Sequence, residues 1–174
     1  MARKSVSPRL TINLASSLAS ADMDVPSAGG VTVAFDYAAS AAAVTLPPGA
    51  DVTVNKSRMK ILFDLTARNL PAGASARILG VEFSKPNEPS GSYAPGGVFE
   101  NSATFTDRQG AAHTIFGTWQ QGKHHLKVID DNPVSAGAAE QAYGYKVWVQ
   151  VTDASGSVSY FDSPDPQIID QPTT

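Results

Sequence analysis

The stretch that decides the fold is YGYKVWVQVT, residues 143–152, followed by DASG (153–156) and SVSYFD (157–162). Residues 143–152 alternate with a period of two, which is typical of a β-strand with one buried face. One face carries Tyr143, Tyr145, Val147, Val149 and Val151, and the other carries Lys146, Trp148, Gln150 and Thr152. We therefore predict that the valine face lies in the core and that Trp148 points away from it.

The residues after this strand predict a hairpin. Asp153 to Gly156 forms a four-residue connection with a glycine available for a left-handed position. A return strand to about Asp162 would pair Thr152 with Ser157 and place Phe161 opposite Trp148. Immunoglobulin-like sandwiches often close with such a hairpin, and a tyrosine near its start is typical of their tyrosine corner.

Strand periodicity recurs along the rest of the chain. Residues 31–37, 59–65 and 77–83 alternate between apolar and polar, and turn-forming residues such as Pro47-Pro48-Gly49 separate these runs. A second hairpin is predicted over 112–131, turning at Gln121-Gly122 and pairing His113 with Asp130. The Leu14 to Met23 and Ser135 to Tyr143 segments compete as helix but are too short to change the class.

This pattern predicts an all-β protein, an antiparallel immunoglobulin-like β-sandwich formed as one domain over residues 1–174. The chain exceeds a minimal sandwich of that kind by about 70 residues. We therefore expect extra N-terminal strands or long loops, with a loop around 85–98. The polar tail at about 170–174 is expected to fray.

Composition narrows the class of protein further. The 174 residues include 13 Lys and Arg against 16 Asp and Glu, for a formal charge of 13 − 16 = −3, and no cysteine. Disulfides, thiolate zinc sites and a cysteine nucleophile are thus excluded. A weakly acidic chain lacks the basic surface of a nucleic-acid binder, so no nucleic-acid partner is predicted.

The location of the protein is predicted from its start. No segment approaches the apolar length needed to span a bilayer, so no membrane association is predicted. Residues 10–14 alternate as a strand does, and Thr11 and Asn13 interrupt what would be the apolar part of a secretory signal. We expect a cytoplasmic protein, with export as the alternative.

The usual catalytic and metal-binding motifs are missing from the sequence. It contains no phosphate-binding glycine loop, no Gly-x-Ser-x-Gly and no His-Glu-x-x-His. His124 and His125 are adjacent, so on a strand they would point to opposite faces and could not bind one metal ion without a bulge. His113 with Asp130 is either an orienting pair for general-base catalysis or a cross-strand polar pair.

Two acidic clusters are possible calcium ligands. Residues 22–24 and 130–132 offer carboxylate oxygens, but neither forms the Asp-x-Asp-x-Asp-Gly loop with a distal glutamate. The favoured interpretation is that both are solvated turns or strand ends. We predict no metal and no cofactor.

Two dipeptides place a carboxylate before a proline: Glu88-Pro89 and Asp165-Pro166. Proline pushes the residue before it toward an extended conformation, so each carboxylate is held on a stiff backbone. This would preorganise Glu88 and Asp165 as ligand contacts. Alternatively, the prolines end strands and protect sheet edges.

With these two dipeptides and the Tyr-x-Tyr-x-Val-x-Val strand, the chain resembles the small bacterial proteins called the DP-EP family. The resemblance covers the second half of the chain and implies a bacterial all-β sandwich, with no catalytic residue to carry over. The ending Tyr160-Phe161 followed by Asp165-Pro166-Gln167-Ile168-Ile169 is also similar to bacterial inclusion-body proteins of the PixA/AidA type, which are β-rich.

The outward face of the 143–162 hairpin is the candidate binding surface. Grouped exposed aromatics with a polar rim often mark a contact surface, here made by Trp148, Phe161, Lys146 and Gln150. Two copies stacking through it would form a symmetric homodimer. Alternatively a sugar stacks on Trp148, or the N-terminal residues cover Trp148 as a second core layer.

The sequence therefore predicts a non-enzymatic binding or assembly protein that self-associates into a homo-oligomer. One alternative is a calcium- or carbohydrate-binding module. The other is a hydrolase in which Glu88, Asp165 and His113 converge in a cleft.

Overall fold

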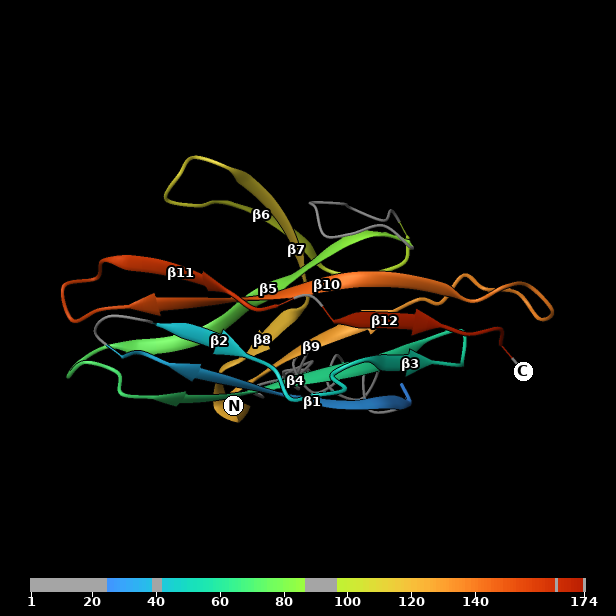
Figure 1. Ribbon diagram of the computed structural model, residues 1–174, viewed down its shortest axis with the longest axis horizontal. Coiled ribbons are helices and arrows are strands. Elements are labelled where there is room, and N and C mark those ends of the chain that lie inside the picture. Colours follow the sequence, from blue (N-terminus) through green and yellow to red (C-terminus); the bar gives the residue numbers. More distant parts are fainter. Residues whose placement is uncertain (1–24, 39–41, 87–96, 165, 174) are drawn as a thin grey trace, which may run out of the picture.

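The strand predicted over residues 143–152 is the centre of the fold. The structure is a computed structural model that describes residues 25–38, 42–86, 97–164 and 166–173. Here β10 runs over Gln141–Thr152, and its valine face is buried as predicted, with Tyr145, Val147 and Val149 at most 1% exposed. β10 pairs on one side with β5 (Ser75–Pro86). On the other side it pairs first with β12 (Gln167–Asp170) and then with β11 (Val158–Asp162) (Figure 1).

The chain forms two β-sheets. The seven-stranded sheet has the order β3-β12-β10-β5-β7-β6, with β11 paired to β10. Its remaining strands are β3 (Val52–Val54), β6 (Ser102–Thr106) and β7 (Ala112–Phe116). The five-stranded sheet has the order β2-β1-β4-β9-β8. Its strands are β1 (Ser27–Asp36), β2 (Ala43–Thr45), β4 (Met59–Arg68), β8 (Thr118–Gln120) and β9 (His125–Asp130).

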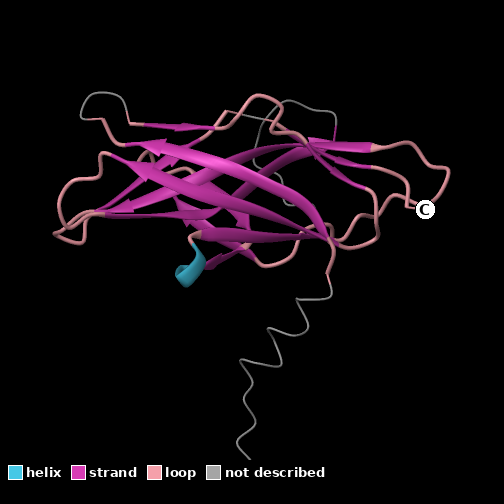
Figure 2. Cartoon of the chain, turned by 90° about the horizontal axis from the view of Figure 1, so that it is seen from below, coloured by secondary structure: helices cyan, strands magenta, loops and turns pink. Residues whose placement is uncertain are grey.

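The all-β class is confirmed. The single helical turn among the described residues is η1 (Gln121–Lys123) (Figure 2). The expectation of antiparallel pairing throughout is wrong, because β1 pairs parallel with β4 and β3 pairs parallel with β12. Parallel neighbours need a long connection, and both pairs have one: β2 and β3 intervene in the first, and most of the chain in the second.

Apolar residues of both sheets form one core. Val31, Val33 and Phe35 alternate along β1 as the sequence predicts, and Ile61 and Phe63 do so along β4. The two sheets meet at the rings of Phe63 and Tyr145, whose centroids lie 5.6 Å apart. The Tyr145 hydroxyl donates a hydrogen bond to the carbonyl oxygen of Ala50, far upstream in the chain, so this tyrosine is not a tyrosine corner.

A β-bulge on β5 sets the faces of that strand. Ile78 pairs with Val149 and Gly80 with Trp148, so Leu79 is an extra residue. Ile78, Val81 and Phe83 all reach the core as a result, whereas simple alternation along residues 77–83 would have divided them. Beyond the bulge, Glu82 pairs with Lys146 and shares its face, away from the core.

The hairpin β10–β11 forms one residue out of the predicted register. Thr152 pairs with Val158 instead of Ser157, because a side-chain oxygen of Asp153 accepts hydrogen bonds from the backbone nitrogens of Ser155 and Ser157, extending the turn. A shift of one residue moves every side chain to the other face. Phe161 therefore packs on the core against Phe35, at 5.2 Å between centroids, and does not lie opposite Trp148.

The predicted hairpin over residues 112–131 is confirmed only close to its turn, where β8 pairs antiparallel with β9, whereas β7 belongs to the seven-stranded sheet. Gly117, at φ 109°, lets the chain pass from β7 to β8, and a Cβ there would lie 2.9 Å from Leu126. His113 pairs with Phe105 of β6 and not with Asp130, and β8 pairs with β9 across η1.

The tail does not fray as predicted. Asp170 belongs to β12 and is fully buried. The backbone nitrogens of Gln171 and Thr173 donate to the carbonyl oxygens of Val54 and Val134. Among the described residues, no helix has the length and apolar character that crossing a membrane requires.

Candidate functional site: a pocket beside Trp148

Trp148 points away from the main core, as predicted, but it is not exposed. Only 7% of the residue is accessible, because Phe105 and His113 pack on the indole at centroid distances of 5.1 and 4.7 Å. Both belong to the β6–β7 hairpin, which rises from the seven-stranded sheet in Figure 1. The prediction of an exposed aromatic patch is wrong. Trp148 lies in a second apolar layer whose cover comes from this hairpin.

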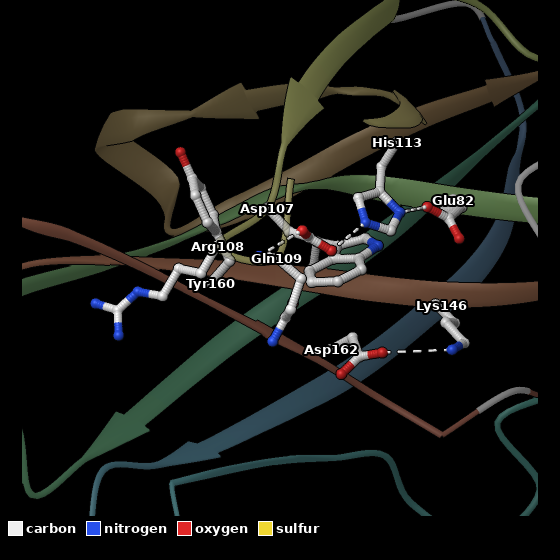
Figure 3. A pocket seen from close by; sticks show the side chains of 9 residues that line it. Glu82, Asp107, Arg108, Gln109, His113, Lys146, Tyr160 and Asp162 are labelled. Atoms are coloured by element: carbon white, nitrogen blue, oxygen red, sulfur yellow. Dashed lines mark hydrogen bonds and ion pairs between the residues drawn. The ribbon is translucent and has the colours of Figure 1, made fainter. Parts of the chain in front are cut away.

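A pocket of about 350 Å³ opens beside this aromatic layer. Its size falls at the lower end of pockets that hold small molecules, roughly 300–1,000 Å³. Figure 3 shows side chains from β5, β7, β10, β11 and the β6–β7 turn around it. The lining residues are Glu82, Asp107, Arg108, Gln109, His113, Lys146, Trp148, Tyr160 and Asp162.

His113 is held between two carboxylates. Its Nδ1 lies 2.6 Å from Glu82 on β5, and its Nε2 lies 2.8 Å from Asp107 in the β6–β7 turn (Figure 3). The side chains of His113, Glu82 and Asp107 are 14%, 7% and 12% exposed. Burial disfavours the imidazolium, but hydrogen bonds and charge from both carboxylates outweigh it and raise the pKa of His113. The ring therefore keeps its proton to a higher pH than a free imidazole does.

Asp107 connects His113 to the turn that carries Arg108 and Gln109. One carboxylate oxygen contacts His113, while the other accepts from the backbone nitrogens of Gln109 and Ala111. Asn and Asp side chains commonly fix turns in this way. The hydrogen bond with His113 is the largest cause that lowers the pKa of Asp107. The position of the turn is thus tied to the imidazole ring.

The remaining polar groups close the pocket on the β11 side. The Arg108 guanidinium donates to the Ser159 hydroxyl and, at 3.3 Å, to the Val158 carbonyl oxygen. Lys146 Nζ lies 3.3 Å from Asp162 Oδ2. Among the described residues, three carboxylates line the pocket together with Arg108, Lys146 and His113, so its formal charge is balanced when His113 is protonated. The pocket offers hydrogen-bond donors, hydrogen-bond acceptors and the aromatic rings of Tyr160 and Trp148. With His113 protonated, it carries no net charge that would attract an ion.

The structure brings together two of the predicted binding residues, Lys146 and Trp148. Phe161 faces the core, and Gln150 accepts a 2.6 Å hydrogen bond from Arg77 Nε and does not line the pocket. Glu88 and Asp165 lie outside the described residues, so their predicted roles stay predictions.

Sequence reasoning missed most of the lining. The missed residues are Glu82, Arg108, Gln109, Asp107, Tyr160 and Asp162. One local signal was present: Asp107 and Gly110 occupy the first and fourth positions of a turn, where these residue types are favoured. Nothing in the local pattern indicated that this turn lies beside β10.

The histidines and acidic clusters show no metal centre in the part of the chain that the structure describes. No group of three or more His, Cys, Asp or Glu side chains is placed there to hold an ion. His124 has φ 53°, and His125 Nε2 lies 3.0 Å from Gln120 Oε1. Asp130 ends β9, as one of the two interpretations predicts, but neither Asp130 nor Asn132 is solvated, because they are 0% and 6% exposed. Residues 22–24 lie outside the described ranges.

The fold and pocket define an all-β protein with a small polar pocket between a hairpin and the outer face of its larger sheet. No protein-family model matches the chain, and no curated protein matches it. Among solved structures, it is similar to an inclusion body protein, PixA, from Burkholderia cenocepacia J2315. The TM-score is 0.35 at 11% identity, over 82% of this chain and 95% of that one. A TM-score this low carries no inference about function.

Proposed function

We propose that this chain is a non-enzymatic binding protein whose pocket beside Trp148 takes a small neutral ligand of the carbohydrate type. The observation that supports it is the mixture of carboxylates and basic groups in the pocket together with its aromatic wall. Sugars offer hydroxyl groups that pair with both carboxylates and cations, and C–H faces that pack on rings. Tyr160 is the half-buried ring of the lining and supplies the stacking surface.

The state of His113 supports a binding role over hydrolysis. A general base needs a free ring nitrogen within hydrogen-bond reach of the proton it removes. Both ring nitrogens of His113 already contact carboxylates. A proton-transfer role would first require that one of these contacts break.

The same contacts argue against calcium as the ligand of this pocket. Calcium takes six to eight oxygen ligands. Glu82 and Asp107 are engaged by His113, and Asp162 faces Lys146. The pocket carboxylates are thus paired with cations and do not converge on one point.

Self-association stays a prediction of the sequence, although Trp148 no longer supplies its surface. The mass of the protein in solution tests it. Membership of the DP-EP family and a cytoplasmic location likewise remain part of this proposal as predictions.

The binding proposal is tested by calorimetric titration with a panel of neutral mono- and disaccharides, with calcium chloride as a separate arm. A true ligand also raises the unfolding temperature with concentration, because it binds the folded state alone. Tyr160→Ala should abolish sugar binding while the protein stays folded. Tyr37→Ala is the matched control: Tyr37 is also half-buried, but it packs on Phe161 away from the pocket.

Binding of a sugar that survives Tyr160→Ala and is lost in Tyr37→Ala would contradict the proposed site. No heat and no thermal shift with any sugar in the panel would contradict the proposed ligand class. A response to calcium alone would favour the calcium-binding alternative.

A further inference from the structure

Among the described residues, the β6–β7 hairpin is joined to the seven-stranded sheet at its base, where Ile115 and Phe116 are buried. Its ladder to β5 consists of the single pair Val81 and Phe116. Its far end is held by the aromatic layer around Trp148 and by the contacts of His113. This end contains the Asp107–Ala111 turn, which forms one wall of the pocket.

Protonation decides how many of these contacts His113 makes. The imidazolium has two N–H donors, one for Glu82 and one for Asp107. The neutral ring has one N–H and one lone pair, so one carboxylate would then face a lone pair and be repelled. Glu82 lies within the 12-residue strand β5, whereas Asp107 lies in a turn. Asp107 is therefore the partner that moves.

Movement of Asp107 carries the whole turn with it. Its second oxygen holds the backbone nitrogens of Gln109 and Ala111, and its own backbone nitrogen donates to the Ala111 carbonyl oxygen. The Arg108 guanidinium also connects the turn to β11, through the Ser159 hydroxyl and the Val158 carbonyl oxygen. The pocket wall thus follows Asp107.

The charged groups around His113 are few. Among the described residues, Glu82 from β5 and Asp107 from the turn contact the ring, and Phe105 of β6 and Trp148 of β10 cover it without charge. Lys146, Asp162 and Arg108 line the same pocket from β10, β11 and the turn. The two carboxylates are thus the groups whose hydrogen bonds change with the ring proton.

We propose that His113 is a pH-operated latch, whose protonated ring holds the Asp107–Ala111 turn against the pocket and whose deprotonation releases it. One consequence of the latch rests on the proposed function: ligand binding in the pocket should be strongest when His113 is protonated. Suppose that the His113 pKa is one unit higher with the turn held against the pocket than with the turn released. Deprotonation of His113 then shifts the equilibrium about tenfold toward the released turn.

The latch is tested in ligand-free, ¹⁵N-labelled protein by NMR between pH 5 and 9. The imidazole of His113 should titrate with a midpoint above 6.5, and the backbone amides of Gln109 and Ala111 should shift with the same midpoint. Glu82→Gln should lower that midpoint for ring and amides together. His124→Gln is the control, since His124 is exposed beside η1, and it should change neither.

Turn amides that stay unchanged while His113 titrates would overturn the latch, as would a midpoint below 6.5. His113→Gln should make both amides independent of pH over this range. If that variant does not fold, Glu82→Gln is the deciding test. Midpoints of the His113 ring and of the two amides that do not change in Glu82→Gln would then overturn the proposal.

A second arm separates the latch from the proposed ligand. Titration of the same sugar panel at pH 5.5 and 8.5 should give weaker binding at 8.5, by about tenfold for each unit of pKa change. Equal affinity at both values would overturn the control of binding by the latch. Sugars that bind at neither pH would overturn the proposed function, while the amide titration would still establish the latch.

Discussion

Asp130 on β9 and Asp170 on β12 bring two carboxyl groups into contact inside the protein, one from each sheet. Both residues are 0% exposed, and none of their four oxygens has a hydrogen-bond donor among the other described residues. Burial first, and then the charge of Asp170, raise the pKa of Asp130 to about 9. Burial raises the pKa of Asp170 to about 6, against a hydrogen bond with Asp130. At neutral pH the pair therefore holds one proton between two buried oxygens.

This pair makes the protein less stable as the pH rises. A carboxyl group whose pKa is higher in the folded state binds its proton more tightly there, so it stabilises the fold at low pH. That contribution is lost as the pH rises from the unfolded value of 3.8 through about 6 and about 9. Asp170→Asn removes the second charge and adds an amide donor for Asp130. We expect it to raise the free energy of unfolding by about 2 kcal/mol at pH 8 and by far less at pH 4.5.

Urea unfolding at the two pH values measures this effect. The matched control is Asp64→Asn, whose side chain is 56% exposed, and it should change stability by less than about 0.5 kcal/mol. Loss of stability in Asp170→Asn at pH 8 would contradict the shared-proton account of the pair.

The burial of Trp148 predicts the outcome of truncating it. Trp148→Ser leaves a cavity between Phe105 and His113, and such truncations of buried aromatics cost about 3–5 kcal/mol. Trp148→Phe keeps the ring contacts and should cost less. Chemical unfolding measures both variants, and sedimentation measures their mass. Loss of an oligomer at full monomer stability would instead mean that Trp148 serves an interface between copies.

The sequence could predict the parts of this fold that depend on local periodicity. The buried faces of β1, β4 and β10 follow from alternation, because a half-buried strand alternates wherever no residue is inserted. The bulge at Leu79 and the turn extended by Asp153 each add one residue to the chain between paired positions. The residues beyond them therefore change face, and Ile78 and Phe161 both face the core. Such single-residue changes leave no trace in the polarity pattern.

The pocket could not be predicted because it depends on contacts between distant segments. His113 meets Glu82, 31 residues earlier in the chain, and packs on Trp148 of β10. The placement depends on Gly117, where the chain changes sheets and β7 separates from β9. A glycine in a strand run is compatible with a bulge, a turn or a close approach, so the sequence did not distinguish these.

The hydrogen bond from the Tyr145 hydroxyl to the loop before β3 allows a second test of stability. Tyr145 is 1% exposed, and its hydroxyl lies 2.7 Å from the Ala50 carbonyl oxygen. Tyr145→Phe keeps the ring against Phe63 but leaves that carbonyl without its donor, at an expected cost of about 1–3 kcal/mol. Tyr143→Phe, which loses a part-buried bond to Gln141, should cost less in the same denaturation experiment. Equal costs would mean that burial of the bond does not matter here.

The approach of β7 to β5 depends on Gly80. A Cβ at this position would lie 2.7 Å from Cβ of Ile115, closer than real Cβ atoms come. Gly80→Ala therefore forces the β6–β7 hairpin outward and should lower the free energy of unfolding by about 1–3 kcal/mol.

The same change should also expose Trp148, because the hairpin carries Phe105 and His113, which cover the indole. Acrylamide quenching of Trp148 fluorescence measures this exposure in a Trp119→Phe background, in which Trp148 is the remaining tryptophan. Gly122→Ala is the matched control, since nothing lies within 4 Å of its added Cβ. Unchanged quenching and stability in Gly80→Ala would show that β7 can shift without uncovering the indole, and that the aromatic layer does not depend on the contact between Gly80 and Ile115.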